Sequence, residues 1–125
     1  MSYRVFLPGQ CELQPPKRGD QRRRLTPLSD ELHHMRANIW RVPAGVRGTR
    51  HVEHAQEEIF VVLRGAVTLL LGDPAERVEL TAGSLAVVET DTGQQLRNEG
   101  DAEAIVLVVG APPEQGRAEH LPDAD

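Results

Sequence analysis

Three ionisable side chains between residues 51 and 58 have the types and the spacing of a single chemical site. His51 and Glu53 would lie on the same face of an extended segment, because side chains alternate faces along a strand. A short turn before the next apolar run could bring Glu58 beside them. An imidazole and two carboxylates are good ligands for most divalent metal ions. Without a metal, two close carboxylates do not both ionise easily, so Glu53 and Glu58 would be candidates for a general acid and base.

The rest of the chain has the pattern of an all-β domain that could hold such a site. Short apolar or alternating segments are separated by turns rich in Gly, Pro and Asp, which is typical of an antiparallel sandwich or barrel. We expect strands within 31–42, 59–63, 66–71, 77–80, 84–88, 93–98 and 104–109. The last of these is apolar throughout, which predicts burial on both faces. Residues 99–101 predict a tight hairpin.

Both ends of the chain differ in composition from this central part. Pro and Gly interrupt residues 1–30 too often for a helix, so this segment is expected to be an extended N-terminal arm. Residues 31–113 form the expected barrel, and residues 114–125 a polar C-terminal tail. The basic side chains of the arm are expected to be a solvated surface rather than a phosphate site, since no aromatic residue interleaves them. They are Lys17, Arg18 and Arg22 to Arg24.

The bulk composition limits the classes of partner. A chain of 125 residues is long enough for one apolar core, and its formal net charge of −5 gives no support for nucleic-acid binding. Cys11 is the only cysteine, which excludes an internal disulfide. No secretory leader and no apolar run of membrane-spanning length stands out in the sequence, so we expect a cytoplasmic protein with no membrane partner.

The stretch Gly45–Gly65 resembles the first sequence motif of the cupins. That motif is a glycine, five residues, His-x-His, three or four residues, Glu, six residues and a second glycine. The two terminal glycines, His51 and Glu58 fit it at the longer spacing, while Glu53 occupies the position of the second histidine. The resemblance implies a double-stranded β-helix, the jelly-roll barrel of the cupins.

The register of the first motif leaves two alternatives open. A shift of one residue would turn Glu53 outward, where it would only solvate the strand. At the shorter motif spacing to Glu58, His54 would be the second histidine, and a bulge could then present His54 in place of Glu53. The five-residue gap between Gly45 and His51 favours the longer spacing. His54 is then a surface histidine.

The stretch Gly83–Asn98 has the length of the second cupin motif, which is a glycine, five residues, Pro-x-Gly, two residues, His, three residues and Asn. Its first and last residues fall in register, but its middle departs from the family. Glu89 and Asp91 stand at the proline and glycine positions, and Gln94 stands at the histidine position. Gln94 would be a weak metal ligand, a hydrogen-bond partner for a substrate, or a residue that fills the space of the lost imidazole.

The resemblance implies a metal site formed by His51, Glu53, Glu58 and Gln94. The family suggests a divalent ion, such as manganese, iron, nickel or zinc. Oxygen donors in place of two imidazoles would shift the preference toward manganese, magnesium or calcium and would weaken or abolish binding. The implied function is a metal-dependent dioxygenase, isomerase or cyclase acting on a small molecule. The alternative is a metal-free barrel that only binds a small-molecule ligand, and in both cases we expect a homodimer.

Overall fold

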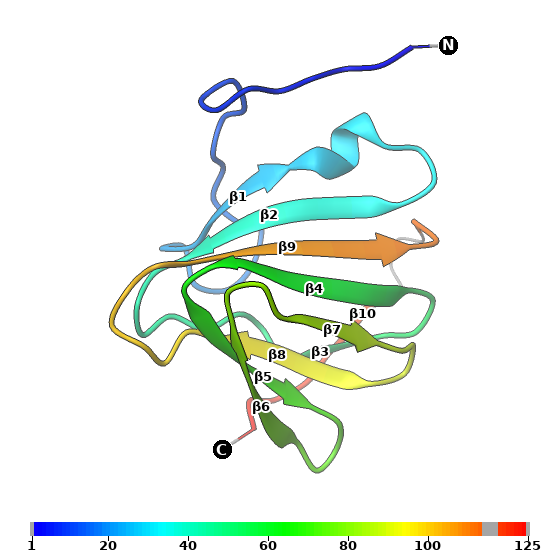
Figure 1. The fold of residues 1–125 in the computed structure, drawn as a ribbon. Helices are drawn as coiled ribbons and strands as arrows, with labels where there is room; N and C mark the ends of the chain where they lie inside the picture. Colours follow the sequence, from blue (N-terminus) through cyan, green and yellow to red (C-terminus); the bar gives the residue numbers. More distant parts are fainter. Residues whose placement is uncertain (1, 114–117, 125) are drawn as a thin grey trace.

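A computed structural model of the chain describes residues 2–113 and 118–124, and within them ten strands and one short 3-10 helix form two facing sheets (Figure 1). The elements are β1 (Arg24–Pro27), η1 (Leu28–Glu31), β2 (Arg36–Val42), β3 (His51–Glu53), β4 (Glu57–Arg64), β5 (Ala66–Leu71), β6 (Glu76–Thr81), β7 (Leu85–Val88), β8 (Gly93–Arg97), β9 (Ala104–Ala111) and β10 (Ala118–His120). No helix in the described residues is long and apolar enough to cross a membrane.

Each sheet has five antiparallel strands. Their orders are β1-β2-β9-β4-β7 in the first sheet and β10-β3-β8-β5-β6 in the second. From β2 to β10 the chain passes from one sheet to the other at almost every connection, with only β5 and β6 adjacent in both sequence and sheet. This winding is the double-stranded β-helix, so the expected all-β jelly-roll barrel is confirmed.

The prediction of a hairpin at residues 99–101 was wrong. The turn joins β8 in the second sheet to β9 in the first, and these two strands are not hydrogen-bonded to each other. Turn residues mark where a chain reverses, but they do not specify which sheet the next strand joins. In this fold β9 pairs with β2 on one side and with β4 on the other, in the first sheet.

The apolar core lies between the two sheets. Phe60 and Val62 of β4 point inward and are buried, while Ile59 and Leu63 on the other face are 41% and 51% exposed. The core cluster consists of Phe60, Val62, Val67, Leu69, Leu80, Val88, Ala104 and Val106. In β9 the alternate residues Ile105, Leu107 and Val109 are only half-buried, so the expected burial of this strand on both faces was also wrong. The outer face of the first sheet has no covering layer of secondary structure in the described residues.

Two segments outside the expected barrel range 31–113 contribute strands to its sheets. In the N-terminal arm, β1 pairs with β2 along residues 24–27. In the C-terminal tail, β10 pairs with β3, with His120 opposite His51. Each segment therefore extends one edge of a sheet, and β10 lies beside β3, which carries His51 and Glu53.

Candidate functional site

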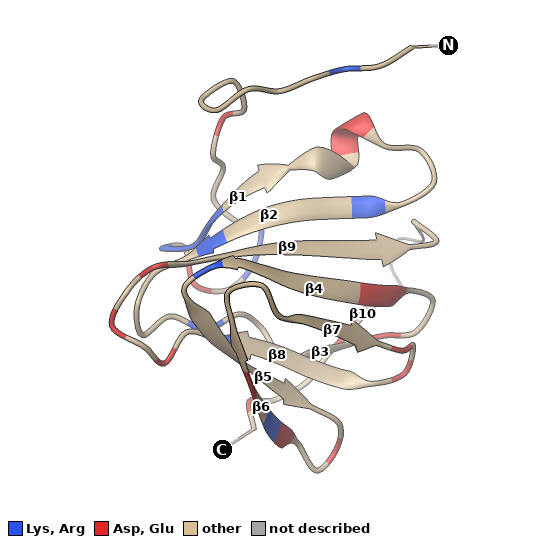
Figure 2. Ribbon diagram, in the orientation of Figure 1, with Lys and Arg blue, Asp and Glu red and all other residues tan. Residues whose placement is uncertain are grey.

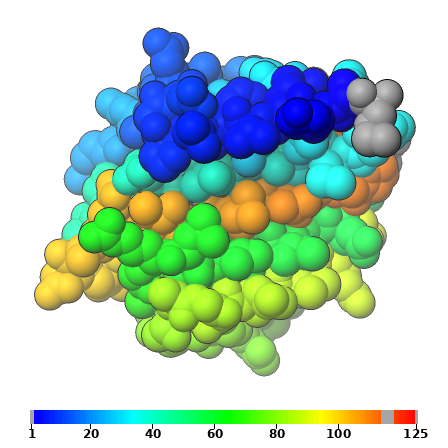
Figure 3. Space-filling view, turned by 45° about the horizontal axis from the view of Figure 1, so that its top comes forward, coloured from blue at the N-terminus to red at the C-terminus, as the bar shows by residue number. Residues whose placement is uncertain are grey.

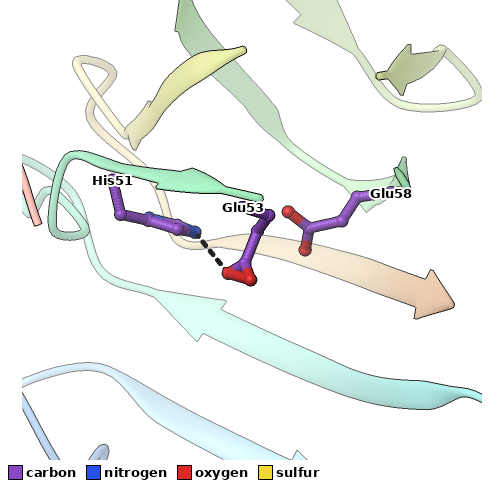
Figure 4. Close-up of side chains that lie close together, drawn as sticks. All are labelled: His51, Glu53 and Glu58. Atoms are coloured by element: carbon purple, nitrogen blue, oxygen red, sulfur yellow. Dashed lines mark ion pairs between the residues drawn. The ribbon is translucent and has the colours of Figure 1, made fainter. Parts of the chain in front are cut away.

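The structure brings His51, Glu53 and Glu58 together inside the barrel (Figure 4). His51 and Glu53 project from the same face of β3, and Glu58 comes from β4 in the facing sheet. One ligand-type atom from each residue lies within 4.8 Å of those of the other two. Gln94 is the neighbour of His51 across the β3–β8 pair, so its side chain is on the same wall.

The imidazole of His51 is oriented by the backbone. Its Nδ1 lies 3.1 Å from the carbonyl oxygen of Thr49, which can only accept a hydrogen bond, so Nδ1 carries the hydrogen. In the neutral ring, the lone pair on Nε2 then faces the cluster, 3.4 Å from Oε2 of Glu53. Burial lowers the pKa of His51, but the contacts with Glu53 and Thr49 and the charge of Glu58 outweigh it and raise the pKa overall. The ring is therefore held as a metal-binding histidine is held.

Glu58 is the most strongly desolvated acid of the cluster. Burial raises the pKa of its carboxyl group, against the lowering effects of the Gln94 hydrogen bond and the charge of His51. The Nε2 of Gln94 donates to its Oε1 over 2.6 Å. Gly110 on β9 leaves room for this arrangement, because a Cβ there would lie 2.9 Å from Oε1 of Gln56 and 3.3 Å from Cγ of Glu58.

The amide oxygen of Gln94 has no hydrogen-bond partner among the described residues. The residue is 2% exposed, and its Oε1 is a buried acceptor without a hydrogen bond to any residue that the structure describes. An unpaired buried acceptor is unfavourable by about 1–3 kcal/mol unless something else satisfies it. The atom belongs to the amide that already contacts Glu58, so it adds a fourth donor group beside the imidazole and the two carboxylates.

The cluster lies on the wall of a cavity of about 350 Å³ between the sheets. Such a volume is within the usual range for small-molecule sites. Phe60 belongs to the core cluster, and Leu96 and Val108 pack against it, so these apolar residues form the floor of the cavity. The other polar residues that line it are Lys17, Arg18, Arg23, Arg36, Asn38, Thr49, Gln56 and His120.

His54, the alternative to Glu53, is not in the cavity lining. It is exposed in the turn after β3, where its Nδ1 lies 2.7 Å from Oδ1 of Asp91 and its Nε2 lies 2.8 Å from Oε1 of Glu119. The structure therefore places Glu53 rather than His54 beside His51. His54 instead connects the turn before β8 to the edge strand β10.

The bridge made by His54 is expected to depend on pH. Hydrogen bonds to Asp91 and Glu119 raise the pKa of His54 above 6.5. Because the pKa is higher in the folded protein, protonated His54 stabilises the fold at a pH below its pKa in the unfolded chain. This stabilisation is lost as the pH rises through its pKa in the folded protein. Replacing His54 with Gln should therefore lower the Tm more at pH 6 than at pH 9. An equal loss at the two values in thermal unfolding would contradict a charged bridge.

Several cavity residues were missed by sequence reasoning. The period-two pattern of β2 could have placed Arg36 and Asn38 on the inner face with Trp40, because these residues alternate with Ala37 and Ile39. No local signal distinguishes Arg23 from its basic neighbours. His120 enters the site because β10 pairs with β3, a contact between residues far apart in the sequence.

Comparison with known proteins identifies the family. The sequence model of the cupin domain matches residues 38–110, which is more than half of the chain. The chain is a cupin. The match includes both stretches that resemble the cupin motifs, and so it contains all four candidate ligands. No curated protein matches this cupin.

Solved structures of other cupin-like proteins share the fold. A sugar phosphate isomerase from a cupin superfamily, from Silicibacter pomeroyi, is 31% identical with a TM-score of 0.65, covering 71% of this chain and 59% of that one. The polyketide cyclase RemF from Streptomyces resistomycificus is 18% identical with a TM-score of 0.83, covering 100% of this chain and 89% of that one. KdgF from Halomonas sp. is 17% identical with a TM-score of 0.77, covering 91% and 97%. This cupin therefore spans about three-fifths of the isomerase.

Proposed function

We propose that this cupin is an enzyme that binds a divalent metal ion through His51, Glu53 and Glu58 and acts on a small polar molecule. The observation that carries the proposal is the convergence of these three groups from facing sheets, within 4.8 Å, on the wall of a cavity of about 350 Å³. Three protein ligands leave positions of a metal ion free for substrate or water.

The donor set fits a divalent ion. His51 has its Nδ1 hydrogen bonded to the backbone, which leaves Nε2 available as a ligand. The two carboxylates supply charge, and a bound cation would offset their mutual repulsion. The Oε1 of Gln94, which accepts no hydrogen bond from a described residue, would be a fourth and weaker ligand. One imidazole with oxygen donors favours manganese or magnesium over zinc or copper.

The proposed reaction class is isomerisation or cyclisation. A bound divalent ion supplies Lewis-acid polarisation of a substrate oxygen and a template for its orientation. The protein itself contributes the apolar side chains of Phe60, Leu96 and Val108 to the cavity lining, and Gln94 holds Glu58 in place. The 31% identical neighbour described as a sugar phosphate isomerase supports this class, although that protein is considerably longer than this cupin.

The proposal is tested by Glu58→Gln. The variant keeps a hydrogen-bond acceptor for Gln94 but loses the negative charge of the ligand. Loss of a residue that only positions a ligand weakens metal binding by up to about 100-fold, so we expect manganese affinity to fall by more than this. Burial raises the pKa of Glu58 above 4.5 in the folded protein. The charged carboxylate therefore destabilises the folded state once the pH exceeds this raised pKa. The Tm of the metal-free variant should therefore exceed that of the wild type at neutral pH. Calorimetric titration and thermal unfolding measure the two effects, and manganese binding of wild-type strength in the variant would contradict the proposal.

A metal-free binding protein is the second candidate. It is favoured by the contacts that the cluster already makes within itself, Nε2 of His51 with Glu53 and Gln94 with Glu58. In that case the cavity would hold a ligand without breaking a bond. Titration of wild-type protein with manganese, iron, nickel and zinc discriminates the two candidates, because the absence of heat with all four would favour the metal-free protein.

We also propose that the chain forms a homodimer. Figure 3 shows the outer face of the first sheet as bands of β2, β9, β4 and β7, with the N-terminal segment along one side. On this sheet, Leu85 and Val87 of the edge strand β7 are 59% and 63% exposed, and Ile59 of β4, which pairs with Val87, is 41% exposed. Such adjoining apolar surface is typical of an interface. Light scattering should give twice the chain mass of 13.8 kDa, and a monomer mass would contradict the proposal.

A further inference from the structure

One wall of the cavity is strongly basic. Lys17, Arg18 and Arg23 line it just before β1, and Arg36 lines the cavity at the other end of β2, in register with Gly110. In Figure 2, Lys and Arg (blue) mark the loop that leads into β1 and both ends of β2. This part of the cavity is therefore positively charged, although the chain as a whole has a net charge of −5.

Two of these four cations lie near the charge of a carboxylate, Arg23 near Asp20 and Arg36 near Glu58. None of them forms an ion pair with any residue in the described parts of the chain, whereas several arginines elsewhere do, such as Arg22 with Asp20 and Arg41 with Glu103. The two carboxylates in the cavity are those that the proposed metal ion would neutralise. The positive charge of the wall therefore remains available to a ligand.

Arg23 is the most unusual of the four, because it is only 7% exposed. Its guanidinium lies over the ring of Trp40, with Cζ 4.9 Å from the ring centroid. Nε and Nη2 donate to the backbone oxygens of Asp20 and Arg18. Nη1 makes no hydrogen bond to a described residue. The carboxylate of Asp20 acts on Arg23 through its charge, but it forms its ion pair with Arg22. A buried guanidinium without an ion pair of its own is stabilised by a bound anion.

The loop that carries the basic side chains is seated tightly against the barrel. Gly19 has φ +79°, and a Cβ there would lie 2.6 Å from Nη2 of Arg23 and 2.8 Å from Cγ2 of Thr49. A glycine is needed for this close approach. Residues 17 and 18, which are exposed and line the cavity, are therefore held close to the barrel.

We propose that the basic wall binds a carboxylate or phosphate group of the substrate, which makes the ligand of this cavity a small anionic molecule. The inference rests on the proposed function in that both place the ligand in the same cavity. Nη1 of Arg23 would donate a charge-assisted hydrogen bond to the anion, with Lys17 and Arg18 adding charge from the arm. The neutral part of the molecule would then extend over Trp40 toward His51 and Glu58.

The single tryptophan provides a direct measurement, because Trp40 lines the cavity beside Arg23. EDTA-treated protein is titrated with glucuronate, glucose 6-phosphate and glucose while the Trp40 fluorescence is recorded. The two anions should give saturable changes, and glucose should bind at least tenfold more weakly. The tighter of the two anions identifies the group as a carboxylate or a phosphate. Equal binding of glucose, or no saturable change with either anion, would overturn the proposal.

Variants assign the binding to the basic wall. Arg23→Gln should weaken anion binding about tenfold or more. Arg41→Gln removes the same charge from the outer face of β2, where Arg41 pairs with Glu103, and should leave the affinity unchanged. Because Arg23 is buried, exposed Lys17→Gln is the second test, with a several-fold weakening expected. Wild-type affinity in both cavity variants would overturn the assignment.

The experiment also separates this inference from the metal proposal. It uses metal-free protein, so anion binding that depends on Arg23 can be found even if no divalent ion binds at His51. Conversely, manganese binding with no preference for anions would leave the metal site in place and remove the basic wall as a substrate site.

Discussion

Replacing His51 with alanine is expected to abolish stoichiometric binding of a divalent metal. The imidazole is the only nitrogen donor among the three clustered groups, and its ring is already oriented by the carbonyl of Thr49. Without the imidazole, only the carboxylates of Glu53 and Glu58 would remain in the cluster. We expect manganese affinity to fall by more than about 100-fold, beyond the effect of losing a supporting residue. Elemental analysis of gently purified protein and calorimetric titration of EDTA-treated protein would measure this.

His54→Ala is the matched control. This histidine is three residues further along the chain, but its ring faces Asp91 and Glu119 at the surface. Metal content should therefore match that of the wild type. Loss of metal in the His54 variant with normal content in the His51 variant would show that the shorter motif spacing is the correct one. Equal metal content in both variants would remove the proposed site.

The first motif predicted its part of the site because the contacts in it are local. The alternation of His51 and Glu53 along one strand follows from backbone geometry. The turn before β4 is short, so Glu58 was bound to lie near the start of the next strand. The alternative with His54 could not be excluded from spacing alone, because one bulged residue would exchange the two faces.

The second motif predicted less because its central residues differ from the family. Gln94 lies beside His51 as the motif implies, since β3 and β8 pair in that register. What the sequence could not show is that one end of its amide is bonded to Glu58 while the other is buried and unpaired. That distinction depends on the packing of two facing sheets.

The terminal segments were the least predictable part. Residues 24–27 and 118–120 become edge strands through pairing with β2 and β3, and neither segment has a strong strand pattern of its own. The burial of Arg23 depends on Trp40 and on the close seating of Gly19. These contacts are made between the N-terminal arm and the barrel, and composition alone predicts no contact between these two parts. The basic wall was therefore not predicted from the sequence.

Replacing Asn98 with alanine is expected to destabilise the fold by about 3 kcal/mol. The side chain is 1% exposed. Its Nδ2 donates to the carbonyl oxygens of Val42 (2.9 Å) and Ala102 (2.8 Å), and its Oδ1 accepts from the amide of Gly100 (3.0 Å). These hydrogen bonds connect the end of β8 with the end of β2 and with the turn that leads from one sheet to the other. Alanine would remove this donor from the buried carbonyl of Val42 and from the carbonyl of Ala102.

Asp101→Ala in the same turn is the control, because Asp101 is exposed and should change stability by less than about 0.5 kcal/mol. Urea unfolding measures both variants. Asn98→Asp distinguishes lost hydrogen bonds from lost volume, since a carboxylate has nearly the same shape but cannot donate to Val42 and Ala102. We expect it to be at least as unstable as Asn98→Ala at neutral pH. Near wild-type stability of Asn98→Asp would mean that packing rather than donation holds this turn.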